Sequence, residues 1–204
     1  MALMEAGMSL TKAAVARRQL GTALALYLAD QDPVSVLVLA CGGGEISEDL
    51  ARTSGKRPFS DYAMSSMPVL TRRDLRQVRN QFWNAFKHAS GRREEERQDA
   101  ELLARFDDVQ NDHHLWVGWY DYGLGAGCLP VEAQVFQVWY FALYPEKLDP
   151  SSPRAPIPQQ TFPALRDASR TDQKRALREY IASVRLEPAI IADPRTDTEP
   201  LIMS

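Results

Sequence analysis

The sequence predicts an all-α protein: a helical bundle of about five helices with a proline-rich linker to a C-terminal helix. Apolar residues recur three and four positions apart over most of the first 147 residues, which is the spacing of a buried helix face. Glycines, prolines and capping residues separate these periodic segments. The chain also lacks the set of alternating segments that would build a parallel sheet.

The composition is that of an ordinary globular chain. It has 204 residues, of which 45% are apolar and 25% charged, and a formal net charge of −3. This balance lacks the basic excess of a non-specific nucleic-acid binder. Two cysteines, Cys41 and Cys128, are too few for a disulfide scaffold or a cysteine-rich zinc site. The longest apolar run, 34–41, is too short to span a bilayer, so we expect a cytoplasmic protein without a membrane partner.

The first two segments predict a pair of helices. Residues 9–29 carry a helical stripe, with Ser9 or Thr11 as the cap. The next segment, 34–52, has two interpretations: one buried helix, or a strand, a phosphate-binding loop at Gly42–Gly44 and a helix. We favour the single helix, because the glycines match neither phosphate-loop pattern. They would cost about 1 kcal/mol each relative to alanine, recoverable if another helix packs closely there.

The later segments follow in order along the chain. We expect a loop over 53–69, and then a helix that begins at a Thr71–Asp74 capping box and ends at Ser90-Gly91. A charged and solvated run over 92–99 leads to a helix over 100–122, which Gly123, Gly125 and Gly127 end, and to a further helix from Pro130 through Leu143. An extended linker over 150–163 then connects to a helix over 171–186, which an irregular tail follows.

The aromatic residues and the prolines divide the chain. Ten of the eighteen aromatic residues lie between Phe106 and Tyr144, whereas eight of the thirteen prolines follow from Pro150 onward. We therefore expect a helical bundle domain over 9–147, and a linker, helix and irregular tail over 148–204. Whether the C-terminal helix docks on the bundle is left open by the sequence.

The candidate catalytic residues are Arg79, Asn84 and His88. His88 lies near the end of a helix, and Asn84 is one turn earlier on the same polar face. Arg79 is a candidate only through a weak resemblance of Arg79 and His88 to the Arg-x(4–6)-His motif of HEPN domains. His113 lies in the apolar stripe of the next helix, where a hydrogen-bonded core histidine is the commonest reading. No nucleophile elbow is present, and Cys41 and Cys128 read as small packed side chains rather than as nucleophiles.

Glu45, His113 and His114 are the weak candidates for a metal site. Helical di-metal proteins carry Glu-x-x-His pairs on facing helices, and the sequence contains no such pair. We therefore expect neither an intrinsic metal nor a cofactor.

Four segments together resemble a group of bacterial helical proteins of unknown function that carry an Asn-x-Phe-Lys-His-Ala block. The four segments are Arg17-Arg18-Gln19-Leu20, Asp32-Pro33-Val34-Ser35-Val36, Asn84-Ala85-Phe86-Lys87-His88-Ala89 and Leu129-Pro130-Val131-Glu132-Ala133. The resemblance covers residues 10–147 and implies a helical fold but no activity. In that group alanine mostly occupies the positions of Gly42–Gly44, which also favours a helix.

A weaker resemblance is to HEPN domains, helical bundles that often dimerise and some of which cut RNA with an Arg-x(4–6)-His motif. Here eight residues separate Arg79 from His88. Nine positions of a helix turn the two side chains about 180° apart, so a shared site would require a dimer.

These observations favour a non-catalytic protein-interaction or self-associating module, with a homodimer as the expected assembly and nucleic acid not expected as a ligand. The alternative is a HEPN-like RNA-binding protein or ribonuclease. A metal-dependent helical-bundle enzyme is the third reading.

Overall fold

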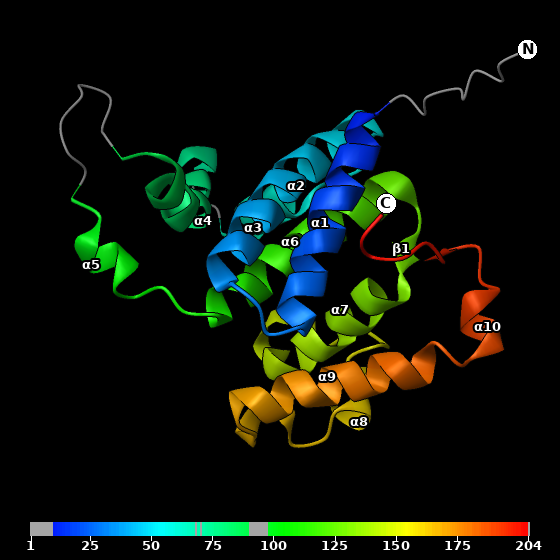
Figure 1. Cartoon of the computed structure of the whole chain (residues 1–204). Helices are drawn as coiled ribbons and strands as arrows, with labels where there is room; N and C mark the ends of the chain where they lie inside the picture. Colours follow the sequence, from blue (N-terminus) through cyan, green and yellow to red (C-terminus); the bar gives the residue numbers. More distant parts are fainter. Residues whose placement is uncertain (1–9, 68, 70, 90–97, 204) are drawn as a thin grey trace, which may run out of the picture.

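The computed structural model describes residues 10–67, 69, 71–89 and 98–203 (Figure 1). Helices dominate this part of the chain, with two strands of two residues each. The elements are α1 (Lys12–Leu28), α2 (Pro33–Thr53), α3 (Phe59–Ser66), α4 (Arg72–Lys87), α5 (Ala100–Leu103), α6 (Val109–Ala126), β1 (Leu129–Pro130), α7 (Val131–Leu143), η1 (Pro145–Lys147), α8 (Ile157–Thr161), η2 (Leu165–Asp167), α9 (Arg170–Val184), α10 (Pro188–Ile191) and β2 (Thr196–Asp197). The all-α prediction is confirmed. No described helix is long and apolar enough to cross a membrane.

The core forms where α2 packs against α1 and α6, with α7 closing it from below in Figure 1. Leu20, Trp119, Phe136 and Trp139 are fully buried there. Burying large aromatic side chains of this kind contributes the main favourable term of folding.

Residues 34–52 form one continuous helix, which confirms the favoured interpretation of that segment. Asp32 caps it, because its carboxylate accepts hydrogen bonds from the Val34 and Ser35 amides. A Cβ at Gly43 would lie 2.8 Å from Cγ of Leu20, and α6 presents a glycine of its own, Gly118, to the same region. Close helix packing therefore requires a glycine at Gly43.

Two segments differ from the expectation near the middle of the chain. The expected loop over 53–69 contains α3, whose Phe59 packs edge-on against Trp116. The expected helix over 100–122 is two helices, α5 and α6. The break arises at Asp107, whose carboxylate accepts from the Val109 amide at 2.9 Å and starts a new helix.

The ends of the neighbouring helices also follow from local chemistry. The Thr71–Asp74 capping box is present as predicted. α4 ends at Lys87, and its predicted stop at Ser90-Gly91 and most of the 92–99 run lie outside the described residues. Gly127, with a φ of 77°, ends α6, whereas Gly123 and Gly125 continue the helix.

The C-terminal quarter docks on the bundle. The expected extended linker contains α8. Phe162 and Leu165 are buried in the same hydrophobic core as the apolar residues of α7. α9 adds Leu177 to that core. In the tail, which was expected to be irregular, β2 pairs in parallel with β1, and the buried Arg17 donates to Asp197 at 2.7 Å. The segment 148–203 thus contributes to the core of the helices that precede it.

Candidate functional site

The three candidate catalytic residues lie on α4 but do not converge. Arg79 points inward, where its guanidinium donates to Oε2 of Glu48 at 2.7 Å. His88 is the exposed residue that caps the end of the helix, and Asn84 is half-buried. Arg79 is therefore engaged with α2, whereas His88 lies exposed in the extended backbone after α4.

Glu48 is the centre of a buried polar cluster between α2, α3 and α4. Besides Arg79, it accepts hydrogen bonds from Ser60 at 2.7 Å and Arg52 at 3.1 Å. Burial by itself would raise the pKa of Glu48, but the hydrogen bonds from Arg79 and Ser60 hold it at about 2. Glu48 is therefore ionised at neutral pH, and Arg79 is its main partner.

Asp121 on α6 is shifted in the opposite direction. Burial raises its pKa to about 6, and the hydrogen bond that Oδ1 accepts from the Phe59 amide opposes this only in part. Two carboxylates with separated pKa values are a known pattern of acid–base sites. The cavity at Arg79, lined also by Glu45 and His114, measures only about 10 Å³, however. That volume holds about one water molecule at most, so this cavity beside Arg79 has no space for a substrate.

His114 contacts the thiol of Cys41, with Sγ 3.4 Å from Nδ1. Burial raises the pKa of Cys41 to about 12 and lowers that of His114 to about 4. Both groups are therefore neutral at pH 7, whereas an activated cysteine requires a lowered thiol pKa. This contact is a hydrogen-bonded part of the core.

Two of the three weak metal candidates, Glu45 and His114, line the same small cavity, whereas His113 is directed toward Tyr140. His113 has a hydrogen-bonding partner, since its Nδ1 lies 3.0 Å from the hydroxyl of Tyr140. His114 faces Cys41, and Glu45 is exposed and accepts from Asn80 at 3.3 Å. Among the residues that the structure describes, no group of three or more histidine, cysteine or acidic side chains is placed to hold a metal ion.

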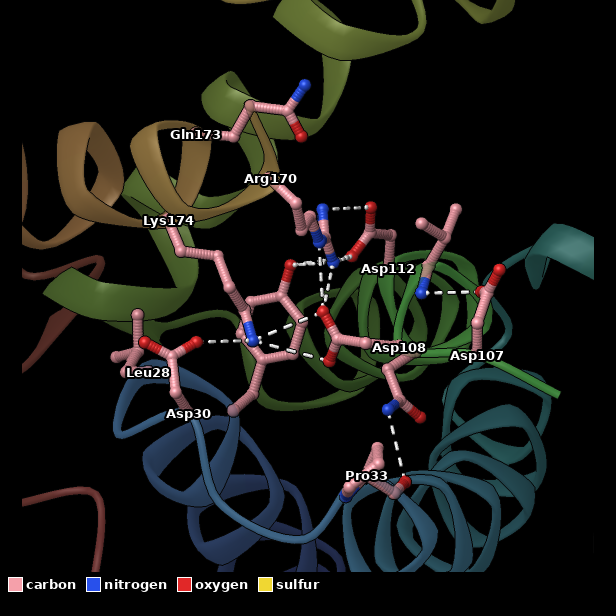
Figure 2. Close-up of polar contacts among 12 residues, drawn as sticks. Leu28, Asp30, Pro33, Asp107, Asp108, Asp112, Arg170, Gln173 and Lys174 are labelled. Atoms are coloured by element: carbon pink, nitrogen blue, oxygen red, sulfur yellow. Dashed lines mark hydrogen bonds and ion pairs between the residues drawn. The ribbon is translucent and has the colours of Figure 1, made fainter. Parts of the chain in front are cut away.

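The largest polar network joins α9 to the rest of the bundle (Figure 2). At its centre is Asp112 of α6, whose side chain is 0% exposed. Its two carboxylate oxygens accept from Tyr27 at 2.6 Å and from Tyr144 at 2.9 Å. Arg170 adds two further hydrogen bonds, at 2.6 and 3.0 Å, in a bidentate pair. A buried carboxylate with this many donors is a fixed structural ion.

A second ion pair extends the network toward the α1–α2 connection. Lys174, whose side chain is 5% exposed, lies 2.9 Å from Asp30 and 3.2 Å from Asp108, and Arg170 also donates to Asp108 (Figure 2). Burial would lower the pKa of Arg170, but its hydrogen bonds to Asp112 and Asp108 hold that pKa above the ordinary value. The network therefore attaches α9 to α6 and to the loop after α1.

Sequence reasoning singled out neither Arg170 nor Asp121. Asp112 could have been found, because it shares a helical stripe with Leu115, Trp116 and Trp119 and so lies where an apolar residue is expected. Asp112 is buried, whereas the neighbouring His113 is only half-buried. Arg170 carries no comparable signal, since it is one of nineteen arginines spread along the chain.

α4 differs from the other long helices in how little it buries. Of its sixteen residues only Phe82 is buried, whereas α7 buries nine of thirteen. Val78 is 66% exposed. Arg73 and Arg76 are also exposed, and neither makes a side-chain hydrogen bond or ion pair within the described part of the chain. The outer surface of α4 is therefore a basic, partly apolar face that the rest of the chain leaves open.

The comparisons with known proteins give no family for this chain. We found no match to a protein-family model, to a curated protein or to a solved structure.

Proposed function

We propose that the protein is a non-catalytic interaction module that binds an acidic segment of a protein partner through the outer surface of α4. The observation that carries this proposal is that only one of the sixteen residues of α4, Phe82, is buried. Most helices in proteins gain their stability by packing an amphipathic face against other elements. In α7 this packing comes from the rest of the same chain. In α4 a bound partner would provide it.

The charge of α4 supports an acidic partner. The helix has five basic residues and one acidic residue, Asp74. Arg79 is paired with Glu48, Arg72 with Asp61 at 2.8 Å, and Lys87 lies 3.6 Å above the ring of Trp83, which leaves Arg73 and Arg76 for a partner. Two copies of this basic helix would repel one another, so charge favours a different, acidic chain over a symmetric α4–α4 dimer.

We propose no catalytic role because the buried polar side chains near α4 are already paired with one another. Arg79 and Glu48 neutralise each other, and the cavity that Arg79 lines is too small for a substrate. Exposed aliphatic residues beside the arginines, such as Val78 and Val69, favour a protein surface over RNA, which proteins recognise through phosphate contacts and base stacking.

Site-specific photocross-linking tests the proposal. A benzophenone amino acid at the exposed Gln77 of α4 is expected to give a protein adduct in cells of the source organism. The adduct should be lost in the double variant Arg73→Glu, Arg76→Glu. The same probe at Glu179 on α9, which is 71% exposed, is the matched control.

The outcomes separate the readings. An adduct to an acidic protein at Gln77 and not at Glu179 supports the proposal. Adducts that are equal at both positions, or that charge reversal leaves unchanged, contradict it. A homodimer adduct would replace the acidic partner with a second copy, and a ribonuclease-sensitive adduct would favour the HEPN-like reading.

A further inference from the structure

A second surface feature lies on the far side of the bundle from α4. A pocket of about 700 Å³ opens between the C-terminal half of α6, the outer face of α7, the segment 148–158 and the residues before β2. In Figure 1 these segments meet around α7, α8 and β1. Its volume lies in the range of pockets that hold small organic molecules, which is about 300–1,000 Å³.

The pocket wall is mainly apolar. It is lined by Tyr120, Leu124, Val138, Phe141, Ile157 and Pro158. These residues come from three segments far apart in the sequence, so the pocket exists only because the C-terminal quarter docks on the bundle. An apolar wall of this size favours a ligand with an apolar body.

Two polar side chains in the pocket have unused hydrogen-bonding capacity. Arg154 is exposed, and Gln137 is half-buried, and neither side chain has a hydrogen bond or ion pair within the described residues. By contrast, Arg195 is held by Asp193 at 2.6 Å, and Gln134 donates to the Leu129 carbonyl and to Thr196. The pocket lining therefore includes one positive charge and one amide that have no side-chain partner among the described residues.

We propose that this pocket binds a small amphipathic monocarboxylate, with its apolar body against Val138 and Phe141 and its carboxylate on Arg154. A guanidinium pairs with a carboxylate through two parallel hydrogen bonds. The lining has a single arginine without a described partner, because Arg195 is paired with Asp193, and one such arginine suits one negative charge better than the two of a phosphate monoester. Cys128 also lines the pocket, and burial raises the pKa of its thiol.

Calorimetric titration with three probes of equal chain length tests this proposal: decanoate, decanol and decyltrimethylammonium, each below its aggregation concentration. Decanoate is expected to bind at one saturable site. Decanol should bind about tenfold more weakly, which corresponds to the loss of about 1.4 kcal/mol, and the cation should not bind.

Variants assign the binding to the pocket. Arg154→Gln is expected to lower decanoate affinity about tenfold and to leave decanol binding unchanged. Gln137→Trp, which fills the pocket, should weaken both ligands. The matched control is Arg105→Gln, because Arg105 is an exposed arginine in the α5–α6 connection that has no described partner. Thermal melting confirms that each variant is folded.

Three results would overturn the proposal: no saturable binding of decanoate, equal affinity for decanoate and decanol, or decanoate binding that Arg154→Gln leaves unchanged. Non-saturable uptake of all three probes would identify adventitious detergent-like association and would likewise overturn it. The outcome is independent of the cross-linking at Gln77, since the pocket and α4 share no residue.

Discussion

Replacing Arg170 by methionine is expected to lower the free energy of unfolding by about 3 kcal/mol. The substitution keeps most of the apolar stem but leaves Asp112, which is 0% exposed, with only its two tyrosine donors. Breaking a buried ion pair from one side costs about 3–5 kcal/mol, and the 27% exposure of Arg170 places its effect at the lower end. Urea unfolding of the variant and the wild type measures this difference.

The control for Arg170 lies on the same helix. Arg175 is 59% exposed and pairs only with Asp172 and Glu179 of α9 itself. Exposed pairs of this kind contribute about 0–1 kcal/mol, so Arg175→Met should change stability little. Adding Asp112→Asn to Arg170→Met should restore part of the loss, because it removes the uncompensated charge. Equal stabilities for the Arg170 and Arg175 variants would show that the network does not hold α9.

Replacing Arg79 by methionine is expected to cost about 2–3 kcal/mol at neutral pH. Glu48, whose side chain is 4% exposed, would keep only Arg52 and Ser60 as donors. Arg76→Met on the same helix is the control and should be nearly neutral, since Arg76 is exposed and has no described partner.

The pH dependence gives an independent readout of the same contact. The folded pKa of Glu48 is lowered, to about 2 from an ordinary 4.5. Its ion pair therefore stabilises the fold fully above pH 4.5, and this contribution is lost as the pH falls from about 4.5 toward 2. In Arg79→Met the acid-sensitive part of the stability curve should be smaller. A variant with the acid sensitivity of the wild type would exclude Arg79 as the residue that holds the pKa of Glu48 down.

The sequence predicted the helical class and most of the helix positions because these depend on local signals. The apolar period predicted α1, α7 and α9, and the Thr71–Asp74 pair predicted the start of α4 to the residue. The segment that became α3 carries no clear period, and its position depends on a hydrogen bond from the Phe59 amide to Asp121, which lies 62 positions further along the chain. Such long-range contacts are not visible in a local pattern.

The polar clusters could be predicted only in part for the same reason. Asp112 interrupts a buried stripe and is therefore visible in the sequence, but its partner Arg170 lies 58 positions away. The helical wheel placed Arg79 and His88 on opposite faces, but His88 lies in extended backbone after Lys87, where the wheel does not apply. It could not show that Arg79 is paired with Glu48, because that depends on how α4 packs on α2.

We expect α4 to be weakly held in the isolated chain and to gain its packing from a partner. Amide hydrogen exchange of the isolated protein at low micromolar concentration tests this most directly. The amides of α4 are expected to exchange at least about 100-fold faster than those of α7, because α4 buries one residue and α7 buries nine. Equal protection of the two helices in the monomer would contradict the account, since α4 would then need no partner.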